Sequence, residues 1–252
     1  MFRFRKRSEG FMLNNTKDFW LNSWKNHLDT YLKANPRTGI FIKVLLGDSI
    51  NNALEIACGS GRDSRYLAKH GYEIVASDFE ENTIDYLKKN LTYSNLSYHV
   101  ADAFDLPFED DYFDLVFHNG FFIYFKENKD IFKLLREQER VSKRYILILV
   151  HNILNINMTD QFRSLSKSDK LYDIRFFEPT ELTDIIKKSN IKYKNISILK
   201  FGGPYDCLYG KRLFRFIPNI LYPIRNNIIP LLYKKQNWAQ TERIACLVEI
   251  SK

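Results

Sequence analysis

The chain has 252 residues, of which 45% are hydrophobic and 27% charged, and its formal net charge is +8. These values are ordinary for one globular α/β domain with additions, and they argue against a disordered chain. The basic start, MFRFRKR, has no apolar run behind it, so we do not expect it to be a secretory signal. Cys58, Cys207 and Cys246 show no metal-binding spacing, so we expect reduced thiols and a cytoplasmic location.

The positive charge is concentrated in two segments. Four basic residues stand near the start: Arg3, Arg5, Lys6 and Arg7. Six more stand in a segment without Asp or Glu: Lys211, Arg212, Arg215, Arg225, Lys234 and Lys235. The rest of the chain therefore sums to about −2 by formal counting. Charge placed in this way favours a local anionic surface or substrate over a long polyanion, so nucleic acid is a disfavoured partner.

Two helices are predicted before residue 50. Residues 16–34 carry Trp20, Trp24, His27, Leu28 and Tyr31 at helical spacing. A second apolar stretch, Ile40 to Leu46, follows Pro36 and Gly39. Aromatic residues at this spacing usually belong to a core, so the simpler interpretation is that these two helices cover a sheet edge.

The segment LEIACGSGRD, Leu54 to Asp63, predicts a ligand-binding turn between a buried strand and a helix that ends before Gly71. Glycine permits positive φ angles and a close approach of ligand to backbone, and the turn directs free N–H groups at the helix start. The next apolar run, Glu73 to Ala76, predicts a parallel neighbouring strand with Asp78 at its tip. An acid there can accept hydrogen bonds from a ribose, so the segment predicts a nucleoside site.

The glycine spacing does not suit a dinucleotide, which requires G-x-G-x-x-G. Counted from Gly59, the third glycine would fall at Ser64, and counted from Ala57 it would fall at Arg62. Neither register fits, so a nicotinamide dehydrogenase is the least favoured interpretation.

From Leu54 onward, strands alternate with helices, which predicts a parallel sheet with helices on both faces. The predicted helices are Asn82–Asn90, Lys126–Ser142 and a helix from Pro179 to about Asn190. The third strand is followed by Asp102-Ala103. The fourth predicted strand is FDLVFHNG, Phe113–Gly120, and the fifth is RYILILVHN, Arg144–Asn152. Asn195–Phe201 and Glu242–Ile250 are predicted as the last two strands.

The arrangement E-x-A-x-G-x-G at Glu55, Ala57, Gly59 and Gly61 resembles the first motif of the class I S-adenosylmethionine-dependent methyltransferases, small-molecule type, in which glycine is usual at the position of Ala57. The ordered features match that family over roughly residues 40 to 200. The resemblance implies a doubly wound, mostly parallel seven-stranded sheet whose last strand is antiparallel. It also implies N-terminal helices that close over cofactor and substrate, and S-adenosyl-L-methionine as cofactor, with S-adenosyl-L-homocysteine as product.

The resemblance also implies roles for individual residues. The turn formed by Ala57, Cys58, Gly59 and Gly61 would receive the methionine part of the cofactor, and Glu55 would orient its amino group. Asp78 would bind the ribose, Phe79 the adenine face, Asp102 beside Ala103 the adenine amine, and Asn119 would lie beside the sulfonium. The alternative for Asp102 is a turn residue. No metal is required for this reaction.

The acceptor side offers fewer signals. The position after the fourth strand reads HNGF, without the N-P-P-Y of exocyclic base methylation and without a cysteine. Family members that act on small molecules often have a histidine shortly afterwards, where this chain has FFIYF with Tyr124. His151, at the end of the fifth strand, is the better candidate for a general base, the alternative being a core histidine. The weaker candidates are His118, Tyr172, Arg175, Phe176 and Tyr205.

We expect one domain of 1–252, divided into a helical cap (1–50), a cofactor-binding core (51–203), a basic apolar insert (204–240) and the last strand (241–252). Pro218, Pro223 and Pro230 interrupt any membrane-spanning helix in the insert. The insert is interpreted as a lid over the substrate, with peripheral contact of residues 211–235 with anionic membrane as a second role.

The sequence therefore predicts a methyltransferase that acts on oxygen or nitrogen of a small or lipid-like acceptor in a biosynthetic pathway. Two alternatives stay open. One is an RNA or protein methyltransferase that uses the basic segments. The other is a non-catalytic interaction module that keeps the cofactor fold.

Overall fold

The computed structural model describes residues 17–209 and 222–252. The basic segment Arg3 to Arg7, and Lys211, Arg212, Arg215 and Pro218 of the insert, lie outside these described residues.

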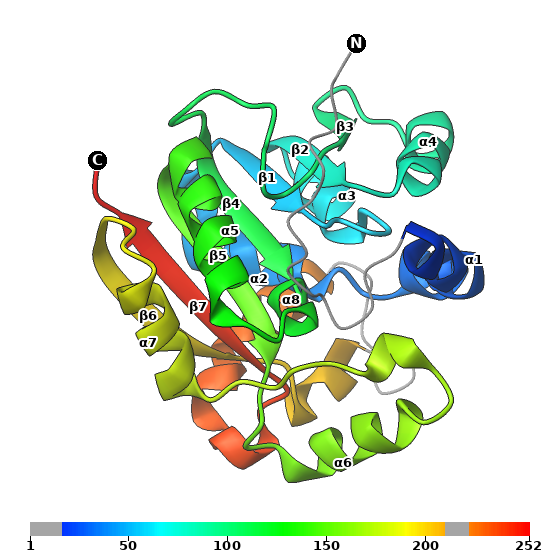
Figure 1. Ribbon diagram of the computed structural model, residues 1–252, viewed down its shortest axis with the longest axis vertical. Coiled ribbons are helices and arrows are strands. Elements are labelled where there is room, and N and C mark those ends of the chain that lie inside the picture. The colour runs from blue at the N-terminus through cyan, green and yellow to red at the C-terminus, as the bar shows by residue number, and fades with distance from the viewer. Residues whose placement is uncertain (1–16, 210–221) are drawn as a thin grey trace.

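Within the described chain, seven strands form one sheet in the order β3-β2-β1-β4-β5-β7-β6 (Figure 1). The strands are β1 (Asn52–Ile56), β2 (Glu73–Asp78), β3 (Leu96–Val100), β4 (Phe113–Asn119), β5 (Ser142–His151), β6 (Tyr193–Phe201) and β7 (Arg243–Ile250). All pairings among β1 to β5 are parallel, whereas β7 is antiparallel to both β5 and β6. The doubly wound sheet with an antiparallel last strand is therefore confirmed.

Helices cover both faces of this sheet (Figure 1). The α-helices are α1 (Lys17–Lys33), α2 (Arg37–Leu46), α3 (Arg62–Lys69), α4 (Glu81–Asn90), α5 (Asn128–Val141), α6 (Ile156–Leu165), α7 (Pro179–Lys188) and α8 (Tyr222–Leu232). One buried apolar cluster joins α5 and α7 to the sheet, and a second joins α2, α3, α4 and α8 to the opposite face. The sheet is thus the middle layer of three.

The local sequences of α5 and α7 explain which side of α5 is buried and where α7 begins. In α5, Ile131, Leu134 and Leu135 are fully buried at helical spacing, which sets this face against β4 and β5. Helix α7 begins with a capping box between Glu178 and Glu181, with Pro179 at its first position. Helix α6 was not predicted from the sequence.

The described part of the insert packs on the body of the protein. Helix α8 contacts α2, and Ile229 and Tyr233 are buried in the same cluster as Ile40 and Phe41. The short helix η4 (Pro204–Tyr209) adjoins them. No helix of residues 17–209 and 222–252 is both long and apolar enough to span a membrane.

Candidate functional site

A cavity opens at the carboxyl ends of β1, β4 and β5, where the strand order reverses between β1 and β4. Ligands bind at this point in open α/β sheets because the loops on either side diverge. Nine of the residues predicted for the site line this cavity: Glu55, Ala57, Cys58, Gly59, Asp78, Phe79, Asn119, Tyr124 and His151. The topology therefore gathers residues that are up to 96 positions apart in the printed sequence.

The loop after β1 is held in a left-handed conformation. Ala57, Gly59 and Gly61 have φ angles of 53°, 52° and 59°. For Ala57 this conformation costs about 1–2 kcal/mol that glycine would avoid. Gly61 does not line the cavity; it is the residue that precedes α3, and its N–H donates to the carbonyl of Cys58 at 2.9 Å. The loop thus turns the chain sharply from β1 into α3.

Two buried carboxylates lie near the start of α3, Glu55 on β1 and Asp63 in the first turn of α3. Glu55, 4% exposed, accepts hydrogen bonds from the backbone N–H of Ser64 at 3.1 Å and from its hydroxyl at 2.5 Å. Asp63 accepts one from the N–H of Gly39 at 2.9 Å. Burial and then the charge of Asp63 raise the pKa of Glu55 to about 8. A cationic group in this part of the cavity would favour the charged form of Glu55.

Asp78 joins the tip of β2 to the glycine loop. One carboxylate oxygen accepts from the N–H of Gly59 at 2.9 Å and the other from the N–H of Glu80 at 3.1 Å. Burial raises the pKa of Asp78, and these hydrogen bonds oppose the shift. The backbone N–H of Phe79 also hydrogen-bonds to Asp78. Because a carboxylate has about four acceptor sites, Asp78 retains capacity for a ligand hydroxyl.

A smaller hollow adjoins the main cavity and shares Ala57, Asp78 and Phe79 with it. Asp102 and Ala103 line this hollow and not the main cavity. One oxygen of Asp102 also accepts from the N–H of Phe104 at 3.0 Å, which is the turn contact considered as an alternative for this residue. The two hollows meet at Asp78, so a ligand with two parts could span both.

Helix α1 forms the outer wall of the main cavity through five side chains: Trp20, Ser23, Trp24, His27 and Tyr31. Trp24 lies so close to the glycine loop that a Cβ atom added to Gly59 would be 2.4 Å from its ring. His27 contacts Asp169 at 3.0 Å, and the guanidinium of Arg62 lies 5.6 Å from the ring centre of Tyr31. Helix α1 therefore takes part in the site and does more than cover a sheet edge.

His151 lies at the far end of the cavity, at the end of β5. Its ring centre is 4.9 Å from that of Phe162 and 6.1 Å from that of Phe176. Burial, followed by the charge of Arg243, lowers the pKa of His151 well below its ordinary value. Tyr124 donates to the carbonyl of Leu171 at 3.3 Å, and burial raises the pKa of its phenol. Tyr124 is thus a neutral side chain that is already hydrogen-bonded.

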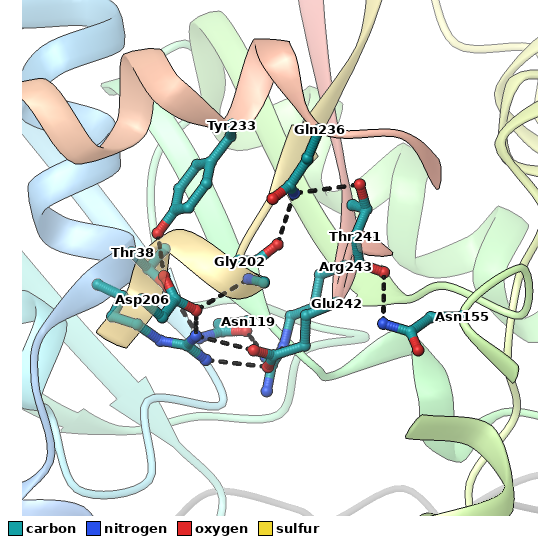
Figure 2. Close-up of polar contacts among 12 residues, drawn as sticks. Thr38, Asn119, Asn155, Gly202, Asp206, Tyr233, Gln236, Thr241, Glu242 and Arg243 are labelled. Carbon is teal, nitrogen blue, oxygen red and sulfur yellow. Dashed lines mark hydrogen bonds and ion pairs between the residues drawn. The ribbon is translucent and has the colours of Figure 1, made fainter. Parts of the chain in front are cut away.

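A polar network joins the side chains of Thr38, Asn119, Glu242 and Arg243 (Figure 2). Asn119 donates to the hydroxyl of Thr38 at 2.8 Å and accepts from Arg243. Glu242 accepts from the Nε of Arg243 at 3.2 Å and from both terminal nitrogens of Arg37, at 2.8 and 2.9 Å. Burial alone would raise the pKa of Glu242, but the charge of Arg243 and the hydrogen bond from Arg37 hold it well below its ordinary value.

The network continues into the insert. Asp206 of η4 accepts from Arg37 and from the hydroxyl of Tyr233 at 2.5 Å. Gln236 donates to the carbonyl of Gly202 at 2.7 Å (Figure 2). None of the described residues of the insert lines the cavity, so they support the site from behind.

Four of the five weaker acceptor candidates do not line the cavity. Arg175 donates to the carbonyl of Lys126 at 3.1 Å and to Glu181 at 2.5 Å, and neither it nor Tyr205 lines the cavity. His118 is fully buried against Phe122, and burial lowers its pKa to about 3. Tyr172 does line the cavity, and Phe176 packs on His151 from outside it.

Several lining residues were not assigned to the site from the sequence, notably Arg62, Phe162 and Arg243. The only signal for Arg243 was a basic residue at the start of an otherwise apolar strand, RIACLVEI. Among the residues that the structure describes, no group of three or more His, Cys, Asp and Glu side chains is placed to hold a metal ion.

Residues 54–148 match a family model described as a methyltransferase domain. The demethylmenaquinone methyltransferase of Clavibacter sepedonicus is 41% identical over 64 residues, which are 25% of this chain and 26% of that protein. The chain covers less than half the length of either curated relative that it matches, 26% of one and 45% of the other.

Two solved structures share the fold over most of the chain. An S-adenosylmethionine-dependent methyltransferase of Archaeoglobus fulgidus has a TM-score of 0.61 and 15% identity, over 90% of this chain and 99% of that one. The phosphoethanolamine N-methyltransferase 2 of Haemonchus contortus, bound to phosphomonomethylethanolamine and S-adenosylhomocysteine, has a TM-score of 0.62 and 17% identity, over 95% of this chain and 61% of that one. At these identities the likeness shows the fold.

Proposed function

We propose that this chain, whose residues 54–148 match a methyltransferase domain and whose fold is that of S-adenosylmethionine-dependent methyltransferases, methylates an oxygen or nitrogen of a small or lipid-like acceptor. When bound, the cofactor supplies an electrophilic methyl group on a sulfonium. The protein then holds the acceptor in line with that methyl group and excludes water. The free thiols Cys58, Cys207 and Cys246 support a reducing, cytoplasmic setting.

The observation that carries the proposal is the pair of hollows that meet at Asp78. The main cavity is lined by the carboxylates of Glu55, Asp63 and Asp78, which suit a ligand with an ammonium and a sulfonium group. The smaller hollow presents Phe79 and Asp102, which suit the face and the amine of an adenine. A ribose between the two parts would lie at Asp78. The residues present therefore fit the cofactor.

The acceptor half is proposed at the opposite end of the main cavity. His151 and Asn119 stand there at strand ends, with Tyr124, Phe162 and Tyr172 as aromatic wall. This wall is largely apolar, which supports a small or lipid-like acceptor over a flexible polar chain. Helix α1 covers the cavity and supports water exclusion during transfer.

Calorimetric titration with S-adenosylhomocysteine tests the cofactor, with NAD as control. We expect binding of the first ligand alone. Replacing Asp78 with Ala removes a charged hydrogen-bond acceptor and should weaken binding by about 2 kcal/mol, roughly thirtyfold. Asp85→Ala, at an exposed position on α4, is the matched control and should leave affinity unchanged. Equal affinity of the Asp78 variant and the wild type would refute its ribose role, and binding of neither ligand would contradict the proposed function.

A further inference from the structure

Strands β5 and β7 place His151 and Arg243 side by side at the acceptor end of the cavity. The two residues are direct partners in the antiparallel ladder, and both line the cavity. Direct partners project from the same face of a sheet with Cβ atoms about 5 Å apart. A single ligand atom can therefore contact both side chains.

His151 is 4% exposed, and neither of its ring nitrogens has a hydrogen-bond partner among the described residues. Leaving a buried polar group unpaired costs about 1–3 kcal/mol, so native proteins rarely do it without a purpose. Its close ring contacts, Phe162 and Phe176, offer no polar partner. A neutral imidazole presents one N–H donor and one acceptor nitrogen, and both are available to a ligand here.

Arg243 has a counter-ion on one side only. Its Nε donates to Glu242 and its Nη1 to Asn119, while Nη2 has no partner within residues 17–209 and 222–252. Glu242 does not line the cavity and is shared with Arg37 of α2. The carboxylate of Glu242 therefore lies on the side of the guanidinium that is away from the cavity, and Nη2 remains as a donor toward the cavity. A planar, permanently charged guanidinium suits an anionic oxygen.

We propose that His151 and Arg243 together bind an acidic oxygen on a flat ring, a phenolic or enolic group in its deprotonated form, and that this oxygen receives the methyl group. The inference rests on the proposed function and narrows its acceptor from oxygen or nitrogen to an anionic oxygen. Phe162 and Tyr172 form the wall for the ring.

Charge balance supports this assignment. The acceptor oxygen forms its bond to the methyl carbon as the carbon–sulfur bond breaks, with that electron pair staying on sulfur and the phenol proton already lost to solvent. Amines, in contrast, arrive protonated and must lose a proton beside Arg243. The charged groups that act on His151 are Arg243, Glu242 and Arg37, and burial and Arg243 lower its pKa, so it is a weak base. The pair selects a deprotonated oxygen and does not need to remove a proton.

The test uses the full chain saturated with S-adenosylhomocysteine and titrated with 4-nitrophenol, whose visible absorbance reports its ionisation. Between about pH 6 and 9 we expect the pKa of the bound dye to be lowered by about one unit, a tenfold preference for the anion. The neutral isostere 4-nitroaniline should bind at least about tenfold more weakly. This comparison uses the wild type and does not depend on whether any variant folds.

Two variants locate the effect. Arg243→Gln removes the charge and should abolish the preference for the anion in protein that is saturated with S-adenosylhomocysteine. Arg175→Gln, away from the cavity, should keep this preference. The inference is overturned if 4-nitrophenol binds in its neutral form, or if it does not bind to protein that does bind S-adenosylhomocysteine. It is also overturned if Arg243→Gln weakens the binding of S-adenosylhomocysteine and not the binding of the dye. If the dye binds as an anion and S-adenosylhomocysteine does not bind, the anion site stands and the proposed function fails.

Discussion

At the scale of single residues, the buried acid Glu55 on β1 makes the free energy of unfolding depend on pH. Glu55 lies among Ser64, Asp63 and Arg62, and burial is the main reason that its pKa rises to about 8 from an ordinary 4.5. A carboxyl group with this shift binds more protons in the folded than in the unfolded state between those two pH values. The free energy of unfolding therefore falls as pH rises through this window.

Replacing Glu55 with Gln should remove this fall, because glutamine keeps the shape and hydrogen-bond acceptor but does not titrate. In the wild type, we expect Glu55 to lower the free energy of unfolding by up to about 1.4 kcal/mol for each unit by which pH rises. Urea denaturation at several pH values between about 5 and 8 measures the slope. Glu73→Gln, at an exposed position on β2, serves as control and should keep it. Equal slopes in the wild type and the Glu55 variant would contradict the raised pKa.

Some residue assignments were within reach of sequence reasoning and others were not. Glu55, Gly59 and Asp78 follow a local spacing, and the topology of parallel strands brings their positions together without further information. Arg243 depends on the register between β5 and β7, which the sequence of either strand alone does not define. The left-handed φ angle of Ala57 is set by the turn as a whole. Alanine disfavours this conformation, so the residue type alone does not indicate it.

At the scale of elements, strands and most helices could be predicted because their apolar periodicity is strong. Helix α6 was not, since Ile156 and Leu165 are exposed and the helix buries only a small apolar face. The part played by α1 was also underestimated, because aromatic residues at helical spacing look the same whether they face a core or a cavity. Deciding between these requires knowing what the helix packs against.

The ion network that joins α2, η4 and β7 makes a testable contribution to stability. Arg37 lies between Asp206 and Glu242, and its side chain is 21% exposed. Arg37→Met leaves two largely buried carboxylates without this cation and should lower the free energy of unfolding by about 3 kcal/mol. Arg163→Met, which breaks a pair whose side chains are both 65% exposed, is the control and should cost less than about 1 kcal/mol.

The sign of the pH dependence provides a second readout for this network. The pKa of Glu242 is lower in the folded protein than its ordinary 4.5, so its contribution is present above that value and is lost as pH falls below it. The stability difference between wild type and Arg37→Met should therefore shrink in acid. The proposed contribution of the network would be contradicted if this difference stayed constant with pH. It would also be contradicted if Arg37→Met lowered the free energy of unfolding no more than Arg163→Met does.

At the scale of the whole molecule, the insert gives one face of the protein an unusual composition. Ile228 and Leu231 of α8 are 45% and 52% exposed, and the exposed Lys234 and Lys235 follow them. Apolar side chains beside lysines suit the surface of an anionic membrane. We propose that this segment makes peripheral contact with lipid, whereas a lid role for the insert stays a prediction that the described residues do not test.

Cosedimentation with vesicles measures this contact. We expect binding to vesicles that contain an anionic phospholipid, weakening as salt is added. The double variant Ile228→Ser and Leu231→Ser should lower partitioning by about tenfold or more. The matched control changes Leu154 and Ile156, which are 38% and 62% exposed elsewhere on the surface. Binding that is equal for neutral and anionic vesicles, or equally reduced in both variants, would exclude this face as the contact.

The direction of β7 has a practical consequence for handling the protein. Because β7 is antiparallel to its neighbours, its first residue, Arg243, lies at the cavity. Its last residue, Ile250, lies at the opposite end of the strands. The exposed Lys252 therefore projects away from the mouth of the cavity, as the position of the C-terminus in Figure 1 shows. Attachment of the chain to a sensor surface or a reporter through this end leaves the ligand entrance facing solvent, so immobilised protein remains open to every titration described above.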